Sequence, residues 1–541
     1  MKKDKKGSNP GNKISRRDVI KNVSAVSLLA PFAYGILSGS FIKDTSILKR
    51  PNTTTRPKFF SLRLDLDNKI LLRGPVIAKR GTTLKIGIIG VGNRSKALME
   101  ALGFMDPKRY KSLSKASKKS KSSKSRLETF LSQEMLNVEV VAICDVFDYH
   151  LDRAERIVTK GVQPNAELVN FKQVKRYLHY QDLLANKNID AVVIATPDFH
   201  HAEMIIAAAK AGKHVYCEKA MTHTEEELYE VYDTVKNSNI VFQLGHQLSK
   251  SESYKRAREI INKKLIGDVN LVEVTTNRNT DSGAWIRHLD SKGNLKPGSL
   301  ETINWDLWLG KAPKVPFSLD RFYGWAKWFD YDTGLAGQLF SHEMDGINQI
   351  MGFGIPKSVT SSGGLYVYND GRDMPDTFQV VAEFPDRKFS VLYSATLNNS
   401  RSRGRVYMGT DGSMEVGGTL KVFADSNSSQ YEDKIKKGLV DSSLQIYSFP
   451  KDKNNMEIDA VSGATEKYYA DRGLMDTKIG GKSIDITYLH IKEWVDAIRD
   501  GGVTSCNIEK AFIDTVPVLM AHKSYVEKRR VEWDSINRRI I

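Results

Sequence analysis

The sequence predicts an α/β protein whose first folded domain is built on a doubly wound parallel sheet. Residues 86–89 form an apolar run that leads directly into a glycine-rich loop. Further apolar runs alternate with segments of helical periodicity as far as residue 247. This alternation is typical of a parallel sheet with helices on both faces, and the loops after its strands then face one crevice.

The glycine loop follows the first strand and has the spacing GxGxxG, with serine in the third place, in the run GVGNRS. The first glycine permits a tight turn, the second lets the backbone approach a pyrophosphate, and the NH groups of the next helix face that anion. The same spacing also occurs in ordinary strand-to-helix turns. The candidate cofactor contacts in this loop are Gly90, Gly92, Asn93 and Arg94.

A second apolar run, residues 138–146, contains an acidic residue near its end, Asp145. A carboxylate at this position can accept hydrogen bonds from an adenosine ribose. Val146 and Phe147 follow, with no arginine to pair with a 2′-phosphate, so the sequence favours NAD over NADP. Asp145 lies further beyond the loop than the usual interval of about 20 residues. An insertion accounts for the difference.

The insertion, residues 108–126, contains nine Lys or Arg, seven Ser and no acidic residue. Such a composition buries little apolar surface, so we expect a disordered surface segment. It holds nine charges of the formal net charge of +17, residues 1–21 hold six more, and the rest of the chain is close to neutral. The pI of 9.4 therefore does not indicate a nucleic-acid partner, and we expect none.

The N-terminus carries the run SRRDVIK, residues 15–21, which fits the twin-arginine export consensus, and residues 22–42 are moderately apolar. We expect a signal region over residues 1–42, a linker over 43–82, and export by the twin-arginine machinery to the periplasm. The cleavage site is unclear, and residues 22–42 could just span a bilayer, so association with the membrane stays open. Because free dinucleotide is made in the cytoplasm, an exported enzyme should hold its NAD tightly.

Several polar residues fall at the carboxyl ends of the later strands, where loops of a doubly wound sheet meet the cofactor. The cysteines at 144, 217 and 506 lie in apolar contexts and are expected to be buried thiols, and we expect no metal site. The residues expected at the crevice are Thr196, Pro197, His201, Glu218, Lys219 and Gln247.

The runs IGIIGVGNRS, CDV, ATPDFHHA, AGKHVYCEKA and FQLGHQ resemble the Gfo/Idh/MocA oxidoreductases, NAD(P)-dependent enzymes that act mostly on sugars and polyols. With the export signal, the resemblance points to an exported subgroup of the Bacteroidetes type. It implies a Rossmann domain over residues 83–245 and a second α/β domain over 246–541. In the family the second domain has an open, largely antiparallel sheet that covers the nicotinamide and often mediates oligomerisation, so a homo-oligomer is expected.

The EKP motif of the family matches Glu218, Lys219 and Ala220. In the family this lysine lies beside the nicotinamide and the substrate hydroxyl, which implies a role for Lys219 in proton transfer. A positive nicotinamide ring would lower the pKa of its amine. The alternative is a structural ion pair with Glu218. Alanine at 220 replaces the proline of the family, and we expect it to loosen the turn that positions the lysine.

A second family motif has Asp, three residues, His, two residues and Asp, and the run GLAGQLFSHEMD matches it with glutamine in the first place. The resemblance makes His342 the leading general base, with Lys219 assisting, Gln338 orienting the substrate and Asp345 contacting it. Glutamine can hydrogen-bond a hydroxyl but cannot take up a proton. A lone histidine on an apolar helix is, however, often a core residue.

Five of the seven tryptophans fall between residues 285 and 328. Aromatic faces pack against pyranose rings, and cationic or hydroxyl side chains add directional hydrogen bonds. We expect most of these tryptophans in the core, and one or two at the substrate, from GWAKW rather than INWDLWLG. The candidate substrate contacts here are Arg321, Tyr323 and Trp325. Residues 424–484 are polar and are expected to be an insertion at the edge of the sheet.

These observations predict an exported oxidoreductase that transfers hydride between a hydroxyl of a small carbohydrate and bound NAD. One alternative is an NAD-dependent glycosidase that uses transient oxidation and elimination, as glycoside hydrolases of family 109 do. The lysine retained in the EKA run differs from the sequence associated with that family. A further alternative is a sugar-binding protein in which Gln338 has disabled proton transfer.

Overall fold

The computed structural model describes residues 81–541 except 170, 172, 281, 282, 291, 450–475, 480 and 481. The predicted signal region and nearly all of the predicted linker lie outside the described residues. None of the helices in the described part of the chain is long and apolar enough to cross a membrane.

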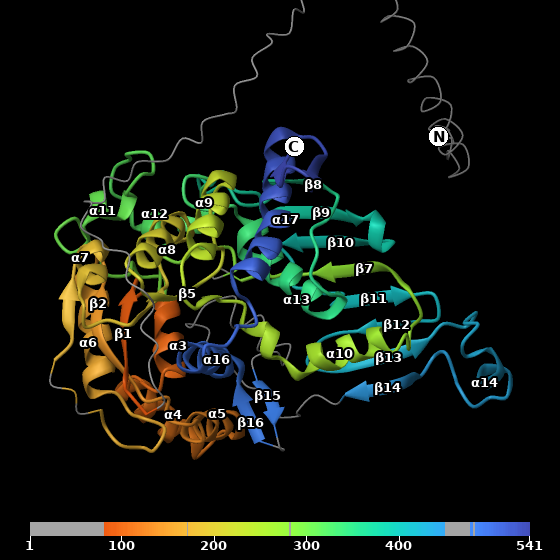
Figure 1. Ribbon diagram of the computed structural model, residues 1–541, viewed down its shortest axis with the longest axis horizontal. Helices are drawn as coiled ribbons and strands as arrows, with labels where there is room; N and C mark the ends of the chain where they lie inside the picture. Colours follow the sequence, from red (N-terminus) through yellow and green to blue (C-terminus); the bar gives the residue numbers. More distant parts are fainter. Residues whose placement is uncertain are drawn as a thin grey trace, which may run out of the picture. The chain divides into compact units, whose positions relative to one another are not determined.

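The first domain contains a six-stranded parallel sheet (Figure 1). Its order, β3-β2-β1-β4-β5-β6, is typical of dinucleotide-binding sheets, and it confirms the predicted doubly wound fold. Burial on both faces explains the nearly continuous apolar runs of the central strands. The strands are β1 (Leu84–Ile89), β2 (Val138–Cys144), β3 (Lys175–Tyr177), β4 (Ala191–Ile194), β5 (His214–Cys217) and β6 (Phe242–Leu244).

The helices of this domain alternate with its strands, as a parallel sheet requires. Helix α9 begins with a capping box, in which the Thr224 side chain accepts from the Glu227 amide and the Glu227 carboxylate accepts in return. The connecting helices are α3 (Asn93–Ala101), α6 (Asp148–Lys160), α7 (Tyr180–Ala185), η1 (Asp198–His200), α8 (His201–Lys210), α9 (Glu225–Lys236) and η2 (Gln247–Lys250).

The basic insertion folds as two helices, α4 (Pro107–Ser117) and α5 (Lys121–Leu131), so the expected disorder is wrong. The Asp106 carboxylate caps α4 by accepting from the Lys108 amide at 2.9 Å. Leu113 and Phe130 are buried together with Met105. Tyr110 and Leu131 also pack against this cluster, while the lysines of both helices are exposed.

The second domain contains a ten-stranded sheet of order β14-β13-β12-β11-β7-β10-β9-β8-β17-β18. Among its described pairs β10 and β7 run parallel and the others antiparallel, which confirms the expected open, mostly antiparallel sheet. The strands are β7 (Val269–Thr275), β8 (Ser358–Gly364), β9 (Thr377–Phe384), β10 (Phe389–Thr396), β11 (Arg405–Gly409), β12 (Gly412–Glu415), β13 (Leu420–Ala424), β14 (Gln445–Phe449), β17 (Val531–Asp534) and β18 (Arg539–Ile540).

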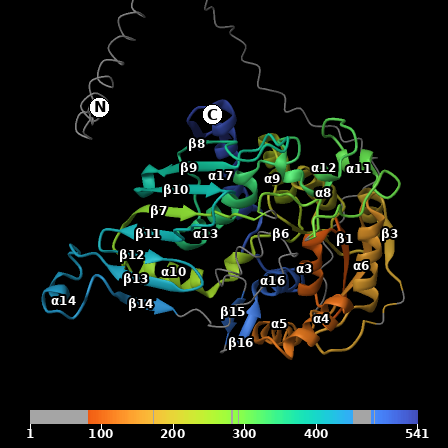
Figure 2. The ribbon, with the colours of Figure 1, turned by 180° about the vertical axis from the view of Figure 1, so that it is seen from behind.

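Helices α10 (Glu252–Asn262), α13 (Ser341–Met351) and α17 (Ile508–Glu527) pack side by side along this sheet (Figures 1 and 2). The predicted insertion at the sheet edge contributes the edge strand β14 and α14 (Glu432–Lys436), and part of it lies outside the described residues. The remaining elements are α11 (Trp305–Leu309), α12 (Leu319–Tyr323), η3 (Trp325–Lys327), the π-helix η4 (Ala336–Phe340), η5 (Pro385–Arg387), β15 (Asp476–Ile479) and β16 (Lys482–Asp485).

Helix α16 (Ile486–Asp500) comes late in the chain but packs against α3 in the core of the first domain (Figure 1). Its residues Ile491 and Trp494 are fully buried there among side chains of β1 and β2. The two domains therefore do not correspond to two continuous stretches of sequence. The boundary predicted at residue 245 places α16 in the wrong domain, because the amphipathic pattern of a helix does not reveal which sheet it covers.

Candidate active site

The glycine loop has the geometry that the sequence predicts. Gly90 has φ of +80°, and a Cβ there would lie 2.7 Å from the amide nitrogen of Thr196, so only glycine fits where the loops after β1 and β4 meet. At Gly92 the nearest atom to an added Cβ is Cε1 of His150, at 3.7 Å. Gly92 is the N-cap of α3 and has no side chain that could cap the first-turn NH groups. These groups suit a pyrophosphate.

Asp145 is tied to the glycine loop. Its carboxylate accepts hydrogen bonds from the amides of Val91, at 2.8 Å, and Phe147, at 3.0 Å. Nδ1 of His150 lies 3.3 Å from the same carboxylate. The predicted ribose acceptor therefore lies next to the predicted pyrophosphate site, as a dinucleotide requires. Arg153 also reaches this loop and donates to the carbonyl of Val91 at 2.8 Å, a contact that the sequence did not reveal.

Glu218 is held by Arg94 and Gln247. Nε of Arg94 lies 3.0 Å from the Glu218 carboxylate, and Nε2 of Gln247 donates to it at 2.9 Å. Gln247 also donates to the hydroxyl of Tyr216 at 2.7 Å. Three predicted cofactor residues thus form one network that fixes the loops after β1, β5 and β6. The hydrogen bonds of Glu218 go to Arg94 and Gln247, which does not favour the alternative of a structural pair with Lys219.

Lys219 is hydrogen-bonded to Gln338 instead. Its Nζ donates to Oε1 of Gln338 at 2.9 Å, and Nε2 of Gln338 donates to Asp198 at 2.9 Å. The π-helix η4, of a kind that often marks functional sites, carries Gln338. Burial lowers the pKa of the Lys219 amine, and the negative charges of Asp198 and Asp332 oppose this effect. The glutamine therefore orients the lysine.

The two aspartates were not predicted. Burial raises the pKa of Asp198, and the charge of Lys219 opposes it. Burial, followed by the charge of Asp198, raises the pKa of Asp332 well above the ordinary value. A Cβ on Gly337 would lie 2.3 Å from Oγ1 of Thr333 and 3.1 Å from Oδ1 of Asp332, so glycine leaves room for these two side chains. Asp198 lies two residues after Thr196, and Asp332 lies six before Gln338. The sequence did not show that the fold brings both carboxylates to Lys219.

The turn at Ala220, which we expected to be loosened by the missing proline, makes several hydrogen bonds. The peptide bond between Lys219 and Ala220 is cis. The amide of Ala220 donates to Asp198 at 3.2 Å, a bond that proline could not make. The ring nitrogens of His201 lie 2.6 Å from the carbonyl of Ala220 and 2.9 Å from that of Thr196. Completely buried, His201 joins the loops after β4 and β5. Pro197 precedes η1, the turn that carries Asp198.

His342 is buried on α13, and its ring centroid lies 5.7 Å from that of His246. Burial, followed by the charge of Lys219, lowers the pKa of His342 well below the ordinary value, so the ring is neutral at neutral pH. Asp345 lies outside the hydrogen bonds around Lys219. It is fully buried and accepts from Gln349 at 3.0 Å, with Oδ1 3.7 Å from Nδ1 of His246.

The predicted sugar contacts belong to an aromatic cluster around Trp308 and Trp328. Arg321 donates to Asp330 at 3.2 Å and to Tyr331 at 3.0 Å. The hydroxyl of Tyr323 donates to the carbonyl of Pro297 at 2.6 Å, and burial raises its pKa to about 12. These two side chains are thus engaged with the protein. Of the five tryptophans in this region, Trp325 is partly exposed and the others are buried, as expected for GWAKW and INWDLWLG.

The strand order, the glycine loop and a buried lysine after β5 are typical of the dinucleotide-binding domains of oxidoreductases. Residues 84–246 match the oxidoreductase family with the NAD-binding Rossmann fold, Gfo/Idh/MocA. The match covers the first domain, less than a third of the chain, and agrees with the class of protein and the NAD cofactor expected from the sequence.

Relatives of known name share parts of the chain. It is 24% identical over 278 residues to the 2,7-anhydro-N-acetylneuraminate hydratase of Escherichia coli, a match covering 48% of this chain and 63% of the relative. It is 32% identical over 163 residues to a glycosyl hydrolase family 109 protein of Shewanella baltica, covering 30% and 28%. The chain thus spans less than two thirds of either relative.

Among solved structures, levoglucosan dehydrogenase in complex with NADH and levoglucosan superposes with a TM-score of 0.53 at 17% identity. The superposition covers 83% of this chain and 99% of that one. At this identity the likeness concerns the fold, and it extends the agreement from the Rossmann domain to the second domain.

Proposed function

We propose that this protein is an NAD-dependent oxidoreductase that acts on a hydroxyl group of a small carbohydrate. The observation that carries the proposal is the buried Lys219 amine, which is oriented by Gln338 and surrounded by Asp198 and Asp332. It follows β5, at the same sheet edge as the glycine loop and Asp145. A proton acceptor thus lies at the carboxyl edge where a doubly wound sheet binds its cofactor.

The residues of the first domain fit NAD. The small Gly92 at the N-terminus of α3 suits a pyrophosphate, and the Asp145 carboxylate beside the glycine loop suits a ribose. Bound NAD would accept or return the hydride of the carbinol carbon. The chain itself handles the proton: the neutral Lys219 amine accepts it from the substrate hydroxyl, and its lowered pKa keeps that neutral form accessible.

Gln338 cannot exchange protons, so its role is to fix the amine while Asp198 and Asp332 balance its charge. The raised pKa values of both carboxyl groups favour their uptake of a proton. Proton transfer can therefore proceed from the hydroxyl to Lys219 and on to a buried carboxylate. The aspartate missing from the family motif is thereby replaced by aspartates from other segments.

A second function, bond cleavage or hydration without net oxidation, is favoured by the neutral His342 near Lys219. Transient oxidation acidifies the neighbouring carbon, and removal of that proton needs a second base. The charge of Lys219 contributes to the lowered pKa of His342, which indicates that the two groups interact. A hydratase and a glycosyl hydrolase among the relatives are consistent with this cycle.

We also propose that the protein is exported by the twin-arginine route, because residues 15–21 fit the consensus of its signal. Outside the cytoplasm no soluble NAD pool would exchange with the site, so the cofactor is held tightly and regenerated on the protein. A homo-oligomer formed through the large open sheet completes the proposal. Fractionation of the producing cells tests the location, and light scattering of the purified protein tests the oligomer.

The activity is tested on the purified full-length chain. Bound nucleotide is released and identified, and the protein is incubated with aryl glycosides and free sugars while NADH absorbance and aglycone release are followed. NADH or ketone formation supports oxidoreduction, and aglycone release without net NADH supports cleavage. Sugar binding without turnover supports a binding protein, and absence of nucleotide refutes both enzymatic functions.

The variant Lys219→Met should abolish turnover and retain the nucleotide. Lys213→Met is the matched control, because this buried lysine precedes β5 at the opposite sheet edge and donates to the carbonyls of Asn186 and Ile189 at 3.0 and 2.6 Å. Its loss should cost stability and leave turnover intact. Unchanged turnover in Lys219→Met would refute the assigned role.

A further inference from the structure

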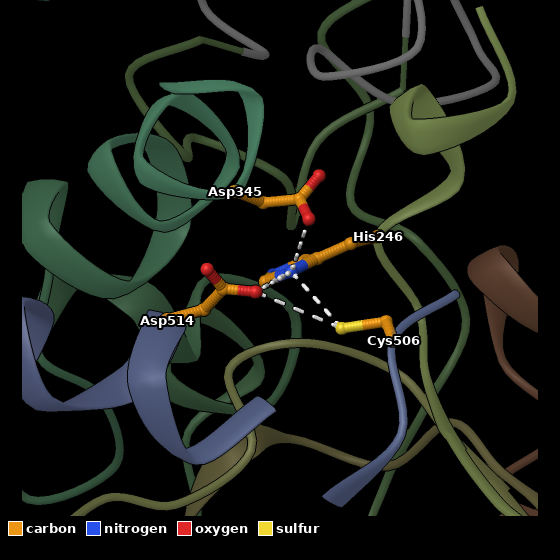
Figure 3. Close-up of side chains that lie close together, drawn as sticks. All are labelled: His246, Asp345, Cys506 and Asp514. Atoms are coloured by element: carbon orange, nitrogen blue, oxygen red, sulfur yellow. Dashed lines mark hydrogen bonds and ion pairs between the residues drawn. The ribbon is translucent and has the colours of Figure 1, made fainter. Parts of the chain in front are cut away.

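Four side chains with metal-ligating atoms meet in the interior next to His342 (Figure 3). His246 lies in the loop after β6, Asp345 on α13, Cys506 just before α17 and Asp514 within α17. All four are buried, and their ligating atoms lie within 4.8 Å of one another. The residues are separated by up to 268 positions, so no spacing in the sequence indicates this cluster.

The separations match a tetrahedral metal site. Nδ1 of His246 lies 3.7 Å from Asp345, 3.6 Å from Asp514 and 3.7 Å from Sγ of Cys506. Sγ of Cys506 lies 3.7 Å from Asp514. In a tetrahedral zinc site, bond lengths of about 2.0–2.3 Å place neighbouring ligand atoms roughly 3.3–3.6 Å apart. These four separations need to shorten by only a few tenths of an ångström, and all ligand atoms lie within 4.8 Å of one another.

The charges in the cluster also point to a cation. Two fully buried carboxylates, Asp345 and Asp514, face one imidazole. Among the described residues, Oδ2 of Asp345 has no hydrogen-bond partner, although burial of an unsatisfied carboxylate oxygen is costly. The other carboxylate is oriented by Asn348, whose amide donates to Asp514 at 2.7 Å. Orientation of a ligand by an amide is typical of the shell around a metal.

We propose that His246, Asp345, Cys506 and Asp514 bind one Zn²⁺ ion in a closed, four-coordinate structural site. The ligand set of one nitrogen, one sulfur and two oxygens suits zinc, and four protein ligands leave no open position for a substrate. The inference is independent of the proposed enzymatic activity.

Zinc binding balances in protons and charge. A thiol at Cys506 and a protonated imidazole at His246 would each give up one proton when Zn²⁺ binds, so two positive charges leave as two arrive.

The ion would join the two domains at the active site. It would tie the loop after the last strand of the parallel sheet to α13 and α17 of the second domain. Asp345 lies one helical turn after His342 on α13, and η4 with Gln338 directly precedes that helix. The metal would therefore hold the helix that carries His342 and that directly follows the Gln338 segment.

The test is the zinc content of the full-length protein, purified without an affinity tag and dialysed against equimolar Zn²⁺. We expect about one zinc per chain and a melting temperature that falls with chelator and recovers with Zn²⁺. Co²⁺ in its place should give the intense visible bands of a tetrahedral site and a thiolate charge-transfer band.

Cys506→Ala should lose the zinc and the charge-transfer band. Cys144→Ala, which removes another buried thiol, should keep both. Asn348→Ala keeps all four ligands and should weaken zinc binding by roughly 10- to 100-fold. Because Asn348 is not a ligand, this variant still tests the zinc site if replacing a ligand prevents the protein from folding. Absence of zinc from the wild-type protein, or equal zinc in Cys506→Ala, would overturn the proposal and leave an imidazolium between two carboxylates.

Discussion

Replacement of Gln338 by glutamate tests how the chain controls the proton of Lys219. The amide of Gln338 accepts from Lys219 at 2.9 Å and donates to Asp198 at 2.9 Å. Gln338→Glu keeps the length and shape of the side chain. The variant places a negative charge beside the Lys219 amine. It also replaces the amide NH₂ that donates to Asp198 with an oxygen.

The magnitude follows from the distance. A unit charge 2.9 Å from the amine, at an effective dielectric constant of about 20, stabilises the protonated lysine by about 6 kcal/mol. This free energy strengthens proton binding by the amine by a factor of roughly 10⁴. Burial lowers the pKa of Lys219 in the wild-type protein from the ordinary 10.5, and the new charge reverses this effect. Oxidation requires the neutral amine, so the rate rises with pH through this pKa.

The assay is the initial rate of sugar oxidation as a function of pH, followed by NADH absorbance. We expect the rising limb of the variant to move to higher pH. At a fixed pH below that limb, the rate depends on the fraction of neutral amine. Each stabilisation of the protonated amine by about 1.4 kcal/mol should therefore lower the rate tenfold.

The control is Gln379→Glu, the same change on β9 of the large sheet, which should leave the pH profile unchanged. An active Gln338→Glu protein with the wild-type pH profile would refute the assignment of Lys219 as the proton acceptor.

Two further predictions concern the cofactor loop and the core. Gly90→Ala should lower the melting temperature and lose the nucleotide, because a φ of +80° alone costs about 1–2 kcal/mol and the added Cβ meets backbone atoms. Gly92→Ala should also lose the nucleotide but keep the melting temperature, because its added Cβ lies 3.7 Å from the nearest protein atom. Wild-type nucleotide content in both would contradict the assigned site. Arg405→Met leaves the buried Glu343 carboxylate without its guanidinium partner and should lower the free energy of unfolding by about 3–5 kcal/mol, measured by chemical denaturation. Adding Glu343→Leu should restore most of this stability. A loss of less than about 1 kcal/mol in Arg405→Met would contradict this interpretation.

Local patterns in the sequence predicted much of the fold and the geometry of the glycine loop. Ile86, Ile88 and Ile89 are all buried in β1, and the loop and Asp145 that follow have the geometry expected of them. These inferences succeed because strand periodicity, glycine geometry and the carboxyl-edge rule act over short stretches. The prediction for the basic insertion was wrong, because its composition concealed two well-capped helices.

The sequence by itself determined the class of protein, the parallel sheet, the glycine loop and the lysine after β5. Only the tertiary structure decided that Gln338 joins Lys219 to Asp198, that α16 completes the first domain, and that His246 meets Cys506 and Asp514. The physical reason is the range of the interactions. Backbone conformation depends on neighbours along the chain, whereas a buried polar group is satisfied by whichever partner the packing of distant segments brings to it.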